Sequence, residues 1–213
     1  SDFLAALVGE RSGFKARLTG ALLKLGFDGH ISSWPTLKIE GAMAADGPSL
    51  RKVMDWVGLT PLPGGGFGRF ALNAQTSVVD KAVAFTGLNI EVDGNAAEGV
   101  LSLTAGARPH LQGTLAAEEI DIAPYLANVQ VLTGNEREWN RVPIRLDGLA
   151  AMELDVRLSA ARVTVGSTRI GRTALAANLR DGRFVLTIGE SQAFDGIAKG
   201  VIGLARASDG ARL

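Results

Sequence analysis

The sequence predicts a mainly β protein. Antiparallel hairpins and meanders are expected to form a curved sheet, groove or sandwich, with one short helix near residues 48–57. Three features predict this class: Asp-Gly pairs recur, apolar and polar residues alternate along many segments, and 27 of the 213 residues are glycine. Abundant small residues with frequent turns favour sheets over a densely packed helical core.

Asp-Gly pairs mark the expected corners between strands. Asp tolerates the left-handed backbone conformation and Gly adopts it at little cost, so the pair is a strong short-range signal for a hairpin. The pairs begin at Asp28, Asp46, Asp93, Asp147, Asp181, Asp195 and Asp209. The last three are 14 residues apart, about one strand plus its turn, so the C-terminal third is expected to be a β-meander.

The alternation of apolar and polar residues predicts that one face of each strand lies in an apolar environment. A period of two places Phe184, Leu186 and Ile188 on one face, and it does the same for Leu101 with Leu103 and for Val83 with Phe85. The candidate apolar-face residues are Val83, Phe85, Leu101, Leu103, Leu111, Leu115, Phe184, Leu186 and Ile188. Strands are expected near 14–20, 22–31, 36–45, 67–78, 82–92, 95–105, 109–118, 151–159, 161–170, 173–180, 183–194 and 196–206.

Two segments depart from the strand pattern. Leu50, Val53, Met54 and Val57 recur at helical spacing, and Asp46 or Ser49 is available as the N-cap. Residues 122–126 predict a single helical turn, with a proline near the first position, where its missing N–H matters least.

The chain divides into three expected parts. Residues 1–127 form an N-terminal β-rich part with the helical insert, 128–148 a loop or linker, and 149–213 a C-terminal meander. The polar segment 133–140 lies within the linker. We expect Trp56, on the inner face of the helix, and Trp34, at a strand end, to be structural plugs, while the role of Trp139 stays open.

Composition excludes several classes of function. Lys plus Arg and Asp plus Glu both total 22, so no basic surface for nucleic acid is indicated. The absence of cysteine excludes disulfides, thiolate zinc sites and cysteine nucleophiles. His30 and His110 are far apart and have no flanking ligand pair, so no metal is expected. Residues 66–71 fit G-x-G-x-x-A but enter a strand rather than a helix, so no cofactor is expected.

The sequence contains one dense acidic cluster and lacks a long apolar stretch. Glu118, Glu119 and Asp121 form the densest acidic group, which we interpret as a solvated strand end rather than a calcium site. No stretch approaches the roughly 18 apolar residues of a membrane span. We therefore expect a non-enzymatic fragment whose targeting segment lies elsewhere.

Two passages resemble the bacterial AsmA family. They run over residues 88–126 and 139–204, within a likeness that covers roughly 36–206. The residues that carry the resemblance are Asp93-Gly94, Arg108-Pro109, Leu111 to Gly113, Ile120-Asp121-Ile122 and Tyr125-Leu126 in the first passage, and Trp139, Pro143 to Leu149, Val163 to Gly166, Leu179 to Arg183, Gly196 and Gly200 in the second.

The resemblance implies a location and a class of function. Members of that family are anchored in the inner membrane by an N-terminal helix and project into the periplasm. Larger relatives are repeating β-groove proteins associated with phospholipid movement and with outer-membrane assembly. The implied partners are phospholipid or outer-membrane protein clients.

A β-groove suits lipid for a physical reason, but the pattern leaves alternatives. Each buried CH₂ is worth about 0.8 kcal/mol, so exposing an acyl chain of about sixteen carbons to water costs on the order of 13 kcal/mol. Pattern alone nevertheless favours a closed sandwich core, covered by another sheet or by the 48–57 helix, over an open groove. A rival function is a scaffold that pairs strand edges with protein clients. A carbohydrate-active enzyme ranks last, because no convincing carboxylate pair is present.

Overall fold

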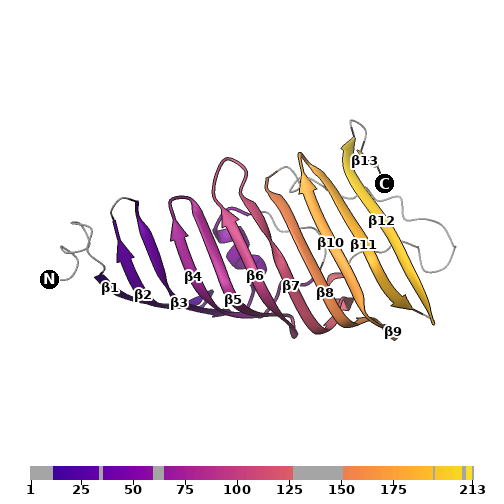
Figure 1. Cartoon of the computed structure of the whole chain (residues 1–213), viewed down its shortest axis with the longest axis horizontal. Helices are drawn as coiled ribbons and strands as arrows, with labels where there is room; N and C mark the ends of the chain where they lie inside the picture. Colours follow the sequence, from indigo (N-terminus) through magenta and orange to yellow (C-terminus); the bar gives the residue numbers. More distant parts are fainter. Residues whose placement is uncertain are drawn as a thin grey trace.

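A computed structural model describes residues 12–33, 36–59, 65–126, 151–193, 195–207 and 210–212. The described chain is mainly β, as predicted, and its strands form a single curved sheet (Figure 1). The strands are β1 Ser12–Thr19, β2 Lys24–Ser32, β3 Lys38–Gly47, β4 Phe70–Val79, β5 Ala82–Val92, β6 Asn95–Thr104, β7 His110–Asp121, β8 Glu153–Val165, β9 Thr168–Ile170, β10 Thr173–Arg180, β11 Arg183–Ala193, β12 Gly196–Ala207 and β13 Gly210–Arg212. The helices are α2 Leu50–Trp56 and α3 Ala123–Leu126.

Strands that follow one another in the chain lie next to one another in the sheet, and one of these pairs is parallel. The order runs β1 to β8 and then β10 to β13, while β9 pairs with β8 as a short hairpin. All pairs are antiparallel except β7 with β8, which is parallel. The expected meanders did not include this parallel pair, because no local pattern specifies it. The sheet is continuous from β7 to β8, and the expected linker 128–148, with Trp139 and segment 133–140, lies outside the described residues.

Asp-Gly pairs close the hairpins at several of the expected corners. Asp93 and Gly94 have φ of 54° and 82°, and Asp181 and Gly182 have φ of 50° and 74°, which is the left-handed pair that a two-residue type I′ turn requires. Asp195, with φ of 61°, turns the chain between β11 and β12.

The other Asp-Gly pairs do not form such hairpins or are not described. Asp28 lies inside β2, and the pair at Asp46 ends β3. In β2 the glycine serves close packing instead of a turn: a Cβ on Gly29 would lie 2.6 Å from the Cα of Gly41 on β3. Asp147 and Asp209 lie outside the described residues.

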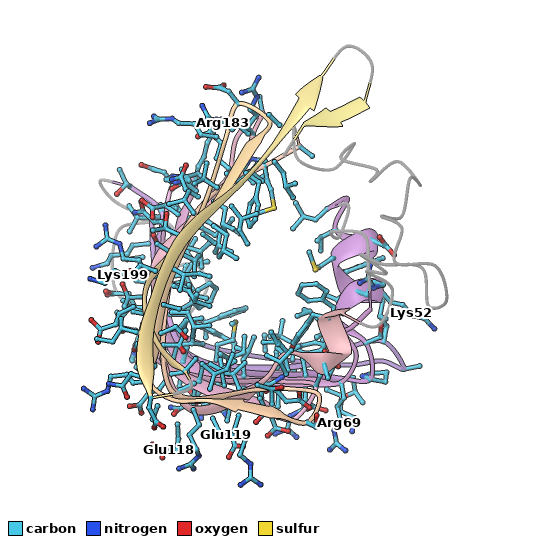
Figure 2. The ribbon with its side chains drawn as sticks, turned by 90° about the vertical axis from the view of Figure 1, so that its right-hand side faces the viewer. Lys52, Arg69, Glu118, Glu119, Arg183 and Lys199 are labelled. Carbon is cyan, nitrogen blue, oxygen red and sulfur yellow. The ribbon has the colours of Figure 1, made fainter. Side chains whose placement is uncertain are left out.

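The sheet is open rather than closed into a sandwich. Figure 2 shows it curving around a concave side, with the two helices lying on the open side. Within the described ranges all strands belong to this one sheet, so no second sheet packs against it. The sandwich that the pattern alone favoured is therefore wrong, because amphipathic strands look the same whether another sheet or a bound molecule covers them.

Helix α2 begins where the sequence predicts. The hydroxyl of Ser49 accepts a hydrogen bond from the Lys52 N–H at 3.3 Å, so Ser49 is the N-cap. The prediction for Trp56 is wrong, since 66% of the residue is exposed. It follows Met54 by two positions and so falls on the other side of the helix. None of the helices in the described ranges has the length and apolarity needed to cross a membrane.

Candidate functional site

The nine predicted apolar-face residues share one face of the sheet. Strand register places Val83 opposite Leu103, and Leu103 in turn opposite Leu111. In the C-terminal half, Leu154 lies opposite Leu179, and Leu179 lies opposite Phe184. All nine are half-buried. We call this face the inner face, and it is the concave side in Figure 2.

Two rows of the inner face cross the sheet without interruption. The first row is Ser12, Ile31, Ile39, Val78, Val83, Leu103, Leu111, Leu154, Leu179, Phe184 and Leu204. The second is Phe14, Gly29, Gly41, Thr76, Phe85, Leu101, Gly113, Val156, Ala177, Leu186 and Ile202. Neither row contains a charged residue, and each crosses eleven strands. At about 4.8 Å per strand, the rows extend roughly 50 Å.

Irregular pairing keeps apolar residues on this face. Between Phe85 and Leu88 the β5–β6 register shifts by a bulge, so that both side chains point inward although they are three positions apart. Leu88 is 2% exposed, and Gly87 at the bulge has a φ of 54°. A strict period of two would have sent Leu88 to the outer face, so this residue was missed by the alternation.

The outer face carries the charges. Figure 2 shows nitrogen and oxygen atoms on the convex side, including Glu118, Glu119, Arg183 and Lys199. Arg162 lies 3.5 Å from Glu118 and 3.6 Å from Glu119, so part of this acidic cluster is ion-paired. Among the described residues, no group of three or more metal-ligating side chains is assembled. The contrast between the two faces is the main chemical feature of the described molecule.

The inner face is only partly covered. Phe14 and Ile202, at opposite ends of the second row, are 41% and 43% exposed, and Leu18 on β1 is 49% exposed. No large side chain in the described residues is below 2% exposure. A contiguous apolar surface that stays partly exposed is typical of a site of interaction with a protein, a membrane or a ligand.

Polar atoms on the inner face are few and mostly paired. The hydroxyls of Thr173 and Ser191, on neighbouring strands, are 3.0 Å apart and both residues are buried. Thr76 Oγ1 is buried without a hydrogen-bond partner. Within the two rows the only hydroxyl-bearing residues, Ser12 and Thr76, are both buried, so the rows present neither a charge nor an exposed hydroxyl group.

A small network fixes the loop after α2 and helix α3 at one margin of the inner face. The Asp93 carboxylate accepts hydrogen bonds from the N–H groups of Phe67 and Gly68, both at 2.8 Å. The ring of Phe67 packs edge-on against Tyr125, with centroids 5.6 Å apart. Burial raises the pKa of the Tyr125 phenol above its ordinary value, while a hydrogen bond with Asn95 opposes this shift.

Helix α2 is held to the same loop. The Arg51 guanidinium lies 5.5 Å from the centre of the Phe67 ring and donates a hydrogen bond to the Gly65 carbonyl at 3.2 Å. These contacts hold the helix on the open side of the sheet, where its Val53 and Met54 are half-buried. The sequence predicted the helix but not these partners, because they depend on chain segments that meet only in the fold.

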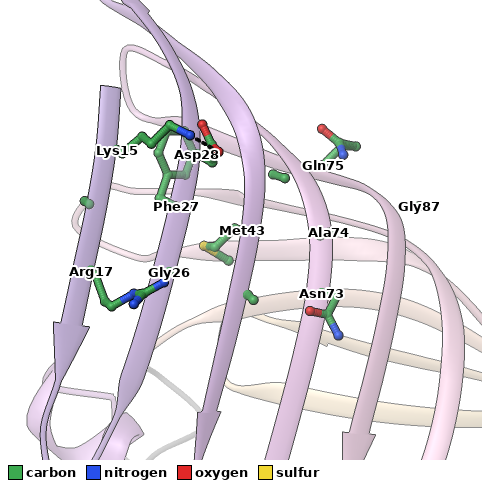
Figure 3. Close-up of a pocket in the computed structure, with 13 residues that line it drawn as sticks. Lys15, Arg17, Gly26, Phe27, Asp28, Met43, Asn73, Ala74, Gln75 and Gly87 are labelled. Atoms are coloured by element: carbon green, nitrogen blue, oxygen red, sulfur yellow. Dashed lines mark hydrogen bonds and ion pairs between the residues drawn. The ribbon is translucent and has the colours of Figure 1, made fainter. Parts of the chain in front are cut away.

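A separate hollow of about 760 Å³ lies over strands β1 to β5 (Figure 3). Lys15 and Arg17 border it on β1, and Asn73 and Gln75 border it on β4. The small residues between them make it shallow. Lys15 pairs with Asp28 at 2.8 Å, and both groups are exposed. The charged and amide side chains at its border lie on the outer face, so the hollow is distinct from the apolar rows.

The two histidines lie on the outer face and on distant strands. His30 is opposite Glu40 on β3, and His110 is opposite Thr104 on β6. The sequence predicted no metal-binding and no cofactor-binding residues. Comparison with known proteins adds nothing to this description: no family model, curated protein or solved structure matches the chain.

Proposed function

We propose that the inner face shields lipid acyl chains from water. The proposed setting is the periplasm, within an inner-membrane-anchored protein that contributes to outer-membrane assembly or lipid homeostasis. The observation that supports the proposal most directly is that two rows of uncharged residues cross eleven strands on a concave and partly exposed face. The role is non-enzymatic.

The energetics favour acyl chains as the occupant. Apolar surface gains about 25 cal/mol for each Å² that is removed from water. Leaving such a face wet is costly, and so is leaving an acyl chain of about sixteen carbons in water, at on the order of 13 kcal/mol. Contact between the two surfaces relieves both costs at once. Flexible chains also adapt to a face that alternates large residues such as Phe85 with small ones such as Gly113.

The cellular setting rests on the order and spacing of motifs along the chain. The residues that resemble the AsmA family run from Asp93-Gly94 on the β5–β6 turn to Gly200 on β12. They therefore span most of the sheet that carries the inner face. Periplasmic location and membrane attachment are part of the proposal on that basis.

Lipid extraction provides the first test. Protein purified from a bacterial periplasm is extracted with organic solvent and analysed by mass spectrometry, and we expect co-purified phospholipid. In parallel, a fluorescent fatty acid is titrated onto lipid-free protein. Binding that saturates at a defined stoichiometry supports the proposal. The absence of both lipid and saturable binding contradicts it.

A matched pair of variants assigns the binding to the inner face. Leu101→Asp places a carboxylate on the inner face of β6, whereas Ser102→Asp places the same group on the outer face one residue later. We expect Leu101→Asp to weaken fatty-acid binding at least about tenfold, because desolvating a charge costs more than 1.4 kcal/mol. Ser102→Asp should bind like the parent. Leu101→Asn makes the same test without a charge if the first variant does not fold.

A second candidate function is a scaffold for outer-membrane protein clients. β1 is the first strand in the sheet order, so one side of its backbone is unpaired among the described residues. Its Phe14 and Leu18 are also exposed. On this hypothesis an extended client peptide adds a strand to β1. Alternation along the β1–β2 pairing directs the Arg17 N–H to the unpaired side, so Arg17→Pro removes a hydrogen-bond donor to the client and abolishes peptide binding without affecting the fatty acid.

A further inference from the structure

Two arginines face each other across the β10–β11 turn. Arg180 ends β10, Arg183 begins β11, and the two are direct partners in the strand register. The two-residue turn between them, Asp181-Gly182, holds their Cβ atoms about 5 Å apart. Both side chains are exposed. Like charges placed directly opposite one another on a sheet repel each other, so an anion bound between them would relieve this repulsion.

The carboxylates nearby are already engaged by a third arginine. Arg108, on the β6–β7 loop, lies 2.6 Å from Asp181 and 3.9 Å from Glu153. In the part of the chain that the structure describes, no carboxylate lies within ion-pair distance of Arg180 or Arg183. Of these three arginines, only Arg108 is ion-paired, and the two that face each other across the turn are not.

The hairpin lies where apolar and polar surfaces meet. Leu179 and Phe184, the residues next to the two arginines, belong to the first row of the inner face and pack together with Leu204. Figure 2 places Arg183 at one margin of the curved sheet, opposite the margin that carries the helices. The two arginines alternate with Leu179 and Phe184 and so project from the outer face, at the last positions before the turn. A molecule that lies on Phe184 and extends past this margin would therefore come next to two cations that make no ion pair among the described residues.

We propose that Arg180 and Arg183 bind a phosphate ester, the headgroup phosphate of a phospholipid whose acyl chains lie on the inner face. The inference rests on the proposed function, since that function supplies the chains. Guanidinium groups match a phosphate geometrically, because each donates two parallel N–H···O hydrogen bonds. Two of them flanking one phosphodiester cancel the repulsion between the arginines and orient the lipid with its headgroup at the margin.

Three soluble probes separate the headgroup from the chains. Dihexanoyl-phosphatidylglycerol carries both, dihexanoylglycerol carries only the chains, and inorganic phosphate carries only the anion. Each is titrated onto lipid-free protein, with affinity measured by calorimetry and the arginine Nε–H signals followed by NMR. We expect the phosphatidylglycerol to bind at least about tenfold more tightly than dihexanoylglycerol and than phosphate.

Charge-matched variants locate the effect. Arg180→Gln with Arg183→Gln is expected to abolish the advantage of phosphatidylglycerol while leaving dihexanoylglycerol binding unchanged. The control, Arg169→Gln with Arg172→Gln, removes the same charge from exposed positions on β9 and immediately before β10, and it should keep the advantage. Thermal melting checks the fold of both, and removing the opposed arginines should not lower the melting temperature.

Each outcome has one consequence. Equal affinities for the two lipids in the parent protein, or equal losses in the two double variants, overturn the proposal and leave the apolar face intact. Phosphate that binds as tightly as the phospholipid shows a site for the free anion and also overturns it. If neither lipid binds the parent or either variant, the proposed function itself fails.

Discussion

Replacing Gly41 with alanine is expected to force β2 and β3 apart at the point where their backbones approach most closely in the second row. A Cβ at Gly41 would lie 2.5 Å from the Cα of Gly29. Carbon atoms in contact are normally about 3.5–4.0 Å apart, so the strands must separate by about 1 Å or more. That movement weakens the neighbouring inter-strand hydrogen bonds, and two such bonds contribute about 1 kcal/mol each. We expect a loss of about 2–3 kcal/mol.

Gly26→Ala is the matched control. Gly26 lies on β2, it has no heavy atom within 4 Å of where its Cβ would stand, and it has an ordinary extended backbone. Alanine there should be neutral or stabilising by up to about 1 kcal/mol, because it restricts the unfolded chain. Urea denaturation measures both free energies of unfolding, with comparable slopes as the check on two-state behaviour. If the two variants differ by less than about 0.5 kcal/mol, close backbone packing is not the reason for Gly41.

Two further predictions concern the buried side chains. Leu179→Ala should lower the free energy of unfolding, measured in urea, by about 2–3 kcal/mol, because Leu179 is 4% exposed and packs on Leu154 and Phe184. Val100→Ala is the control and should cost less than about 1 kcal/mol, because Val100 is 48% exposed. Equal losses in the two variants would contradict the assignment of Leu179 to the core. Tyr125 is the single tyrosine, so phenolate absorbance reports it alone, and its midpoint should lie above the ordinary 10.0 in the folded protein and return there in denaturant. Because the folded pKa is raised, the associated stability is present below about pH 10 and is lost as pH rises through the folded pKa, a step that Tyr125→Phe should remove.

Local pattern was sufficient for most strands, their faces and several turns. The strands expected at 151–159 and 161–170 are an exception, because the structure has one long strand, β8, followed by the short β9. A period of two is a property of each strand alone, so Leu101 and Leu103 could be assigned to one face without knowing what they contact. The turn at Asp181-Gly182 is likewise local, because two adjacent residues supply the left-handed conformations. That turn also implied that Arg180 and Arg183 face each other, a signal that was present in the sequence but not used.

Other features depend on contacts between distant segments. Leu88 reaches the inner face only because the β5–β6 pairing contains a bulge, and Asp93 becomes a ligand for backbone N–H groups only when the loop after α2 folds against the β5–β6 turn. Trp56 was expected to be buried, but α2 presents it to solvent. Helical spacing identifies a face, and the tertiary structure determines which of its neighbours are covered.

The amino-acid sequence by itself determined that extended, two-faced segments joined by tight turns would build this protein, because alternation and left-handed Asp-Gly corners act over a few residues. Only the tertiary structure decided that β7 and β8 run parallel and that the sheet stays open around its uncharged side. Both outcomes depend on the free energy of bringing together residues that are far apart in the chain. A pattern that extends over a few residues carries no information about that free energy.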